Sequence, residues 1–314
     1  MGKDFYRIME NKLSSAAKKN CLGSLAWLGI KKALKFLDFT GLALTVFQKR
    51  DLVRQLIKRN ISVRYRGSFL GIFWSFANPL LMLGVYLFVF GVLFGSRWEG
   101  LNKNTDKPGA FALVMLCGLA IYNIFAETVN YSCNIIITNQ NLVKKVVFPL
   151  ELLSFVQVIA TFLLGLVWFV LLFAGGLFVF GLHWTMLLLP VFLLPLILFS
   201  LGWSYIVSCF GTYIRDTQHV VSVLLQMLFF MSPIFYQFGL VEKKLQAAGW
   251  GWVIYILQLN PLVYIIEDSR RIFLFGELPA NWWYVCLIYL ISIVVFLIGF
   301  YWFRTVKKGF ADVL

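Results

Sequence analysis

One carboxylate stands out among the residues whose type and position could take part in chemistry. Glu127 is the only ionisable residue well inside a long apolar run of this sequence. An ionisable side chain at membrane depth usually faces a helix-bundle interior or a water-filled cavity, and often marks a functional site. Near the end of its run, a carboxylate can also simply face water. The position of Glu127 leaves both roles open.

Few other residues have the types or spacing that catalysis or metal binding requires. The five cysteines occur singly without a C-x-x-C pair, and His183 and His219 are far apart. These spacings predict neither a disulfide framework nor a zinc site. The sequence also lacks the G-x-x-x-x-G-K-[ST] phosphate loop and the G-x-S-x-G and H-E-x-x-H motifs. We therefore expect no catalytic residues, no metal and no cofactor in this chain.

The composition predicts which elements must position these residues. Apolar residues make up 61% of the 314 residues, charged residues make up 13%, and the mean hydropathy is +0.82. A soluble domain has about 45–50% apolar and roughly 25% charged residues. A soluble fold of this size could not bury the surplus, so we predict an all-α, polytopic membrane protein. The net charge of +14 then indicates membrane topology, with no nucleic-acid partner.

Several apolar runs are long enough to be membrane helices, which need about 18 or more such residues. We predict six spans in a transmembrane domain over residues 67–303. They are Phe69–Gly95, Ala110–Cys133, Leu152–Leu182, Trp184–Phe210, Val220–Phe238 and Asn281–Phe303.

Basic residues give the expected orientation of the chain. With six crossings, 21 Lys and Arg residues lie on one side of the membrane and 7 on the other. Because basic loops stay in the cytoplasm, both termini are expected there. The termini comprise an N-terminal extension over residues 1–49 and a tail over 304–314. Within the extension, Cys21–Ile30 is too short to span and predicts a stretch that lies on the membrane surface.

The segment 239–280 tests this topology, because it contains a mostly apolar run, Trp250–Ile266. Gln258, Asn260 and Pro261 interrupt that run, and a seventh span would move the basic tail outside. We predict instead two short helices that dip into the outer leaflet and return. Their charged residues are then expected at the mouth of the protein: Glu267, Asp268, Arg270 and Arg271.

Two basic segments on the cytoplasmic side each have two interpretations. Arg50–Arg66 predicts an amphipathic helix, with apolar residues at helical spacing and basic residues on the other face. This helix either anchors the chain on anionic membrane lipid or forms a platform for a cytoplasmic partner. Asn139–Glu151, NQNLVKKVVFPLE, is either an ordinary connecting loop or a coupling helix that inserts into a groove of a partner.

Aromatic residues make up 18% of the chain. Many are expected to face lipid or to anchor the spans at the membrane interfaces, such as residues 282–284 at the start of the sixth span. The flat faces of aromatic rings also suit the C–H groups of sugar rings. The candidates for such a substrate path lie at interior depth, together with Glu127: Trp74, Tyr86, Tyr122, Phe125 and Tyr236.

Four segments within residues 48–310 carry a family resemblance: Arg59–Pro79 (RNISVRYRGSFLGIFWSFANP), Asn141–Pro149 (NLVKKVVFP), Ser232–Tyr236 (SPIFY) and Asn260–Arg271 (NPLVYIIEDSRR). In this order they resemble the permeases of type-2 ABC exporters, specifically the Wzm-type branch that exports bacterial O-antigen polysaccharide. Residues 1–47 are longer than the core of that family requires.

The resemblance implies a homodimer of six-span subunits around a central channel, in the bacterial inner membrane. Two copies of a separate ABC ATPase subunit would hold ATP and Mg, and the cargo would be a lipid-linked polysaccharide. An interface helix is implied at Asp51–Arg64, a coupling helix at Thr138–Phe148 and gate helices within Gly239–Phe275. The implied partner-coupling residues are Asp51, Arg54, Lys58, Arg59, Arg64, Asn141, Lys144, Lys145, Phe148 and Arg215, and the implied gate residues are Asn260, Tyr264, Glu267, Arg270 and Arg271.

Two alternatives remain open on the sequence. The same machine could export another cargo, such as teichoic acid, capsule or a small hydrophobic drug. A polytopic glycosyltransferase or acyltransferase would need a nucleophile, a base or a metal cluster near the membrane surface. The scarcity of histidines and of paired carboxylates disfavours such an enzyme.

Overall fold

The computed structural model describes residues 39–93, 109–145 and 148–314, and the chain forms two units, 1–48 and 49–314. The first unit contributes one described helix, α3 (Phe39–Gln48). The surface-lying stretch predicted at Cys21–Ile30 is outside the described residues. The second unit holds all the elements discussed below. Its described residues contain helices and no β-strand, which confirms the all-α prediction.

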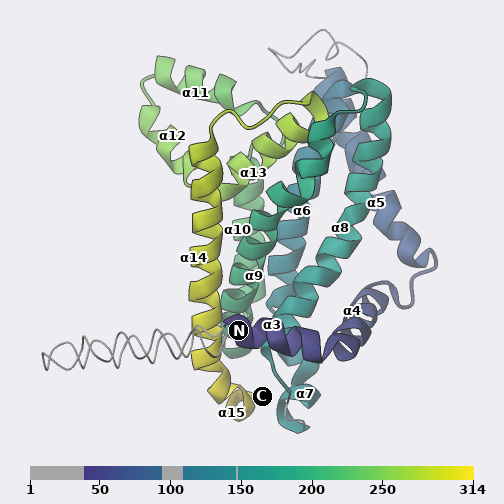
Figure 1. Cartoon of the computed structure of the whole chain (residues 1–314), viewed down its shortest axis with the longest axis vertical. Coiled ribbons are helices and arrows are strands. Elements are labelled where there is room, and N and C mark those ends of the chain that lie inside the picture. Colours follow the sequence, from purple (N-terminus) through teal and green to yellow (C-terminus); the bar gives the residue numbers. More distant parts are fainter. Residues whose placement is uncertain (1–38, 94–108, 146–147) are drawn as a thin grey trace, which may run out of the picture. The chain divides into compact units, whose positions relative to one another are not determined.

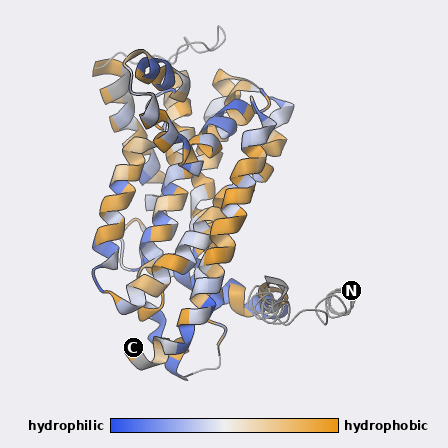
Figure 2. Ribbon diagram, turned by 90° about the vertical axis from the view of Figure 1, so that its left-hand side faces the viewer, coloured by the Kyte–Doolittle hydropathy of each residue, from blue (hydrophilic) through white to orange (hydrophobic). Residues whose placement is uncertain are grey.

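In the described part of the second unit, four helical segments are long and apolar enough to cross a membrane (Figure 1). They confirm the second, third, fourth and sixth predicted spans to within a few residues. Figure 2 shows hydrophobic residues along the long helices, as a lipid-facing surface requires. The segments are α6 (Ala110–Ser132), α8 (Glu151–Val179), η4 (Trp184–Leu188) with α9 (Leu189–Tyr213), and α14 (Trp282–Val306).

The predicted first and fifth spans form shorter α-helices than expected. α5 (Trp74–Tyr86) follows a 3₁₀ turn, η1 (Gly71–Phe73), and continues into the π-helical η2 (Leu87–Leu93). α10 (Thr217–Met231) has 15 residues, below the roughly 20 of a typical span. It ends because Ser232, which precedes Pro233, adopts an extended conformation, as residues before proline commonly do.

The segment after α10 forms three short helices, so the prediction of two was wrong. They are α11 (Phe238–Ala247), α12 (Gly251–Gln258) and α13 (Pro261–Arg270), followed by the π-helical η5 (Arg271–Phe275). The predicted break at Asn260 is confirmed. The Asn260 side chain accepts a hydrogen bond from the Leu262 N–H at 3.0 Å, and Pro261 occupies the first helical position. An N-cap asparagine followed by proline starts a new helix.

The basic segments lie at the end of the second unit opposite α11 and α12 (Figure 1). The predicted amphipathic helix is α4 (Arg50–Tyr65), and the predicted coupling segment contains η3 (Ile137–Asn139) and α7 (Gln140–Lys145). The C-terminal turns η6 (Lys307–Gly309) and α15 (Phe310–Val313) lie at the same end.

The core of the second unit is built around α6. Five of its hydrophobic residues, Val114, Met115, Cys117, Ala120 and Ile121, have no exposed surface. α6 packs against α8, α9 and α13, while α14 packs along α9. Between α9 and α14, the buried Tyr205 ring contacts three phenylalanine rings and its hydroxyl donates to the Glu151 carbonyl at 3.1 Å. The polar residues of α4, α5, α6 and α8 lie beside this packed core.

Candidate functional site

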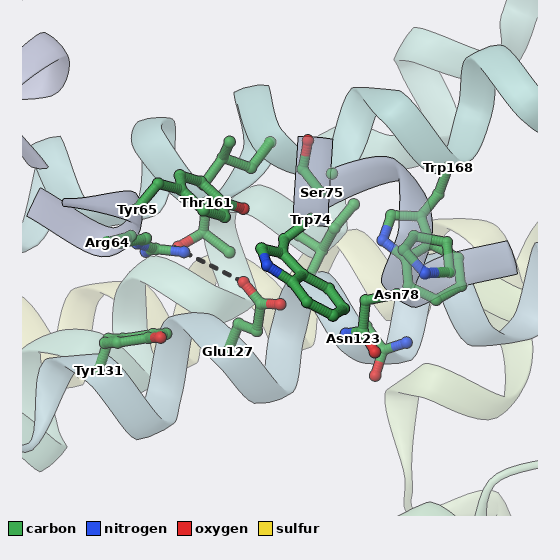
Figure 3. Close-up of a pocket in the computed structure, with 14 residues that line it drawn as sticks. Arg64, Tyr65, Trp74, Ser75, Asn78, Asn123, Glu127, Tyr131, Thr161 and Trp168 are labelled. Atoms are coloured by element: carbon green, nitrogen blue, oxygen red, sulfur yellow. Dashed lines mark hydrogen bonds and ion pairs between the residues drawn. The ribbon is translucent and has the colours of Figure 1, made fainter. Parts of the chain in front are cut away.

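The C-terminal turn of α4 carries an arginine that points into the helix bundle (Figure 3). Arg64 Nη1 donates to Glu127 Oε2 at 3.1 Å, and Arg64 Nη2 donates to Thr161 Oγ1 at 2.7 Å. The guanidinium also lies over the Tyr131 ring, 4.2 Å from its centre. The Arg64 side chain is only 8% exposed, whereas that of Glu127 is 45% exposed. One charged contact therefore joins α4 to α6 and α8.

This ion pair forms part of a pocket of about 250 Å³ between α4, α5, α6 and α8. Trp74 and Asn78 come from α5, Asn123 from α6 and Trp168 from α8. Figure 3 shows the two indole rings beside the two amide groups. A pocket lined by indoles, amides and a carboxylate can hold a ligand that has both apolar and hydroxyl surfaces.

A second pocket, of about 670 Å³, shares Arg64 and Tyr131 with the first. Arg59 donates to the Asn139 side-chain oxygen, and Asn60 Nδ2 donates to Gln157 Oε1 at 2.9 Å. These bonds hold α4 against η3 and α8, so a displacement of α4 would disturb both pockets. Six amide side chains are among the residues that line this second pocket: Asn60, Asn130, Asn134, Asn139, Gln157 and Gln218.

The residues expected to couple to a partner differ in how exposed their side chains are. Arg64 points inward, and Phe148 is half-buried. Lys145 ends α7, and its side chain is outside the described residues. The remaining residues are exposed and accessible to a partner: Asp51, Arg54, Lys58, Arg59, Asn141, Lys144 and Arg215.

Of the six residues expected along a substrate path, only Trp74 and Glu127 line the first pocket. Tyr122 is buried and its hydroxyl donates to the Leu225 carbonyl, while Phe125 is buried and stacks on Phe199 at 5.2 Å. The other two lie apart from the pocket. The Tyr86 ring contacts the Phe235 ring at 5.0 Å, and the Tyr236 hydroxyl donates to the Met231 carbonyl at 2.9 Å.

The expected gate residues surround α13. Asn260 Nδ2 donates to Ser232 Oγ at 3.1 Å, and Tyr264 stacks on Tyr284 at 4.8 Å. Arg271 forms an ion pair with Glu277 at 3.8 Å, and both side chains are substantially exposed. Arg270 was expected beside them at the mouth of the protein, but its side chain is fully buried and has no surface exposed there.

The helix α13 lies outside the four long spans. The electrostatics of its charged residues depend on how deeply each side chain is buried. Glu267 is partly exposed and forms an ion pair with Arg270 Nη1 at 3.3 Å. Burial raises the pKa of Asp268 to about 6, although the nearby Arg271 guanidinium opposes that rise. Asp268 therefore holds its proton more readily than an exposed aspartate does.

Sequence reasoning did not single out Asn78, Asn123 and Trp168 as site residues. Asn78 lies within the motif that carried the resemblance, as the first residue of an Asn-Pro pair. Asn123 is a polar residue inside an apolar span, which was a usable signal. Trp168 gave no signal, because it is one of many aromatic residues in apolar helices and only packing places it at the pocket.

The Arg64–Glu127 pair gives a prediction about stability. Glu127→Gln leaves the charged Arg64 guanidinium buried with a weaker acceptor, which should cost about 1–3 kcal/mol of unfolding free energy. A double-mutant cycle with Arg64→Gln, measured by denaturation of the purified protein, should show non-additivity of about 0.5 kcal/mol or more.

The matched control is Glu277→Gln, which removes the carboxylate of the more exposed pair with Arg271. This change should cost only about 0–1 kcal/mol. Strictly additive effects of Glu127→Gln and Arg64→Gln would show that the contact between them contributes nothing.

Comparisons with known proteins identify the family. Residues 51–274 match the model of the ABC-2 type transporter family, which is more than half of the chain. The O-antigen export system permease protein RfbA of Klebsiella pneumoniae is 28% identical over 267 residues, covering 84% of this chain and 95% of that protein. The protein of the same name from Myxococcus xanthus is 30% identical over 237 residues, covering 74% of this chain and 84% of that protein. The polysialic acid transport protein KpsM of Escherichia coli is 26% identical over 264 residues, covering 82% and 94%. The chain therefore belongs to the ABC-2 type transporter family.

Proposed function

We propose that this chain is the permease subunit of an ATP-driven exporter that moves lipid-linked O-antigen polysaccharide across the bacterial inner membrane. The observation that carries this proposal is the similarity to O-antigen export permeases over most of both chains. Four long apolar helices and a polar pocket beside them suit a transport subunit. Transport needs no covalent chemistry from this chain.

The energy source belongs to a partner in this proposal. Two copies of an ABC ATPase, holding ATP and Mg, dock on the cytoplasmic end that carries α4 and α7. Exposed charges on these helices support the assignment, including Arg54 and Lys58 of α4 and Lys144 of α7. Both termini are then cytoplasmic, and basic α4 also contacts anionic membrane lipid.

The transport path in this proposal lies between two copies of the chain. α5 and α10 complete six spans in each subunit, and the segment α11–α13 gates the outer end. Both helices expose large apolar side chains, such as Leu81 and Val85 of α5 and Leu224 and Met227 of α10. Such surfaces need to be covered by lipid or by a second subunit.

A second cargo is favoured by one observation. The chain is also similar to a polysialic acid transport protein over 264 residues. A capsular polysaccharide is therefore the alternative cargo for the same permease, and the chemistry of the accumulated polymer will distinguish the two.

The docking assignment predicts the result of a charge reversal on α7. Lys144→Glu should weaken binding of the ATPase about tenfold, because a reversed charge at a docking surface removes an attractive contact and adds repulsion. Binding is measured by titrating the purified ATPase onto the permease in lipid nanodiscs. Lys243→Glu on α11 is the matched control, since this exposed lysine lies at the opposite end of the second unit. Equal affinity for both variants would contradict docking at α7.

Deletion of the gene in its host tests the proposed function. Lipid-linked polysaccharide should accumulate inside the cell and disappear from the surface, as cell fractionation would show. Loss of the polymer from both compartments would indicate a role in synthesis instead. A normal surface coat would exclude export of this polymer.

A further inference from the structure

The proposed function assigns no role to several polar side chains that line the first pocket, between α4, α5, α6 and α8. We propose that the pocket lined by Trp74, Asn78, Asn123, Glu127 and Trp168 is a binding site for one uncharged sugar residue of the exported glycan. This inference rests on the proposed function and assigns a sugar site within a single subunit.

The first argument comes from hydrogen bonding. The Asn123 side chain is half-buried and has no hydrogen-bond partner within the described parts of the chain, and the exposed Asn78 amide lines the same pocket. Asn123 lies in the middle of α6, a long apolar helix. An amide facing hydrocarbon without a partner is strongly unfavourable. The pocket therefore has to hold water or a ligand with donors and acceptors.

The second argument comes from the combination of side chains. Each amide offers both a donor and an acceptor, and each sugar hydroxyl needs both. The Trp74 and Trp168 indoles supply apolar surface beside these amides (Figure 3). A sugar ring has C–H faces that pack on indoles and hydroxyl edges that bond to amides. Its two kinds of surface match the two kinds of lining.

The third argument comes from charge. The Arg64 guanidinium is already paired with the Glu127 carboxylate and with Thr161. The two charges of this lining offset each other, so the pocket offers no net positive charge to an anion. A phosphate group would also meet the Glu127 carboxylate, which is 45% exposed. These features favour a neutral sugar over the phosphate of a lipid headgroup.

The fourth argument comes from size. The cavity of about 250 Å³ is smaller than the roughly 300–1,000 Å³ typical of pockets for drug-sized ligands, so it suits a single ring.

Site-specific photocrosslinking in cells tests the occupant directly. Benzoylphenylalanine replaces Trp74 in the full-length chain, expressed with its ATPase in host cells whose glycan is radiolabelled. The matched control places the same residue at Phe76, an exposed aromatic of the same helix that does not line the pocket. The expected result is a labelled glycan adduct at position 74 that is at least several-fold stronger than at position 76.

Each other outcome overturns the inference. Adducts that contain phospholipid without glycan would show that the pocket holds a lipid headgroup, and equal glycan adducts at both positions would show no site. If gene deletion blocks export while position 74 captures no glycan, only this sugar site fails. A deletion that leaves the surface coat unchanged would instead remove the proposed function itself.

Substitution of the amides provides an independent measurement. Asn78→Leu and Asn123→Leu together should lower the rate at which surface glycan appears by about tenfold or more, through the loss of two sets of hydrogen bonds. The permease–ATPase complex should still be recovered from the membrane. Gln246→Leu on α11 is the control, because this exposed amide lies outside the pocket. An unchanged export rate in the double variant would contradict the sugar site.

Discussion

Replacing Arg270 with methionine is expected to destabilise the protein by about 3–5 kcal/mol, the range for breaking a buried charged contact. The Arg270 side chain has no exposed surface. Its guanidinium donates to the carbonyls of Val114 at 3.0 Å, Pro233 at 2.6 Å and Ile234 at 2.8 Å. It also donates to Glu267 Oε1 at 3.3 Å. Methionine fills much of the volume but leaves these acceptors without their donor.

The large effect follows from the position of Arg270, whose side chain links α13 to two other segments. Val114 belongs to α6, Pro233 and Ile234 follow α10, and Arg270 itself ends α13. One side chain thereby fixes the expected gate helix against the core span and the turn after α10. Its role is to position α13, because a fully buried guanidinium cannot contact a passing substrate in this arrangement.

Arg271→Met is the matched control for Arg270→Met. It changes the neighbouring arginine, which is 40% exposed and forms an ion pair with Glu277 at 3.8 Å, and should cost only about 0–1 kcal/mol. Both variants are measured by the loss of folded protein on heating after extraction in detergent. Equal stability of the two variants would contradict a structural role for the Arg270 hydrogen bonds.

Gly299→Ala is expected to cost about 3 kcal/mol, at the upper end of the range for overpacking. A Cβ atom on Gly299 would lie 2.3 Å from the Gly202 carbonyl oxygen. A Cβ atom on Gly202 would lie 2.7 Å from backbone atoms of Val295 and Phe296. Because the obstructing atoms belong to the backbone, α9 and α14 would have to separate. Small residues at such crossings allow close packing of membrane helices.

Gly84→Ala provides the control for that substitution. No atom lies within 4 Å of a Cβ built on this glycine in α5, so alanine should be neutral or slightly stabilising there. The measurement is the melting temperature and the yield of protein extracted from the membrane. An unchanged melting temperature for Gly299→Ala would contradict the close approach of α9 and α14.

Much of the fold could be predicted because apolar runs determine membrane helices directly. The spans that contain Ala110–Ser132 and Glu151–Val179 followed from hydropathy and length alone. The break at Asn260–Pro261 followed from local chemistry, since an N-cap asparagine and a proline start a helix wherever they occur. These features depend on residues that are close in the sequence.

The features that sequence reasoning missed depend on tertiary contacts. The third short helix arises where Gly249 adopts a positive φ of 77°, which turns the chain between α11 and α12. Arg270 has the sequence context of a surface charge, but its donors match three carbonyls from distant segments. The first pocket likewise combines Asn78, Asn123 and Trp168 from three helices. No spacing within one helix reveals such a group.

The most direct test of the export proposal is transport in proteoliposomes. The purified permease and its ATPase are reconstituted together with the lipid-linked polysaccharide of the host, and a sugar-cleaving enzyme outside reports which glycan is accessible. In complexes whose ATP-binding sites face outward, addition of ATP should move glycan into the lumen and protect it from the enzyme. An ATPase variant that binds but does not hydrolyse ATP should give no protection. ATP hydrolysis that leaves all accessible glycan unprotected would contradict the account.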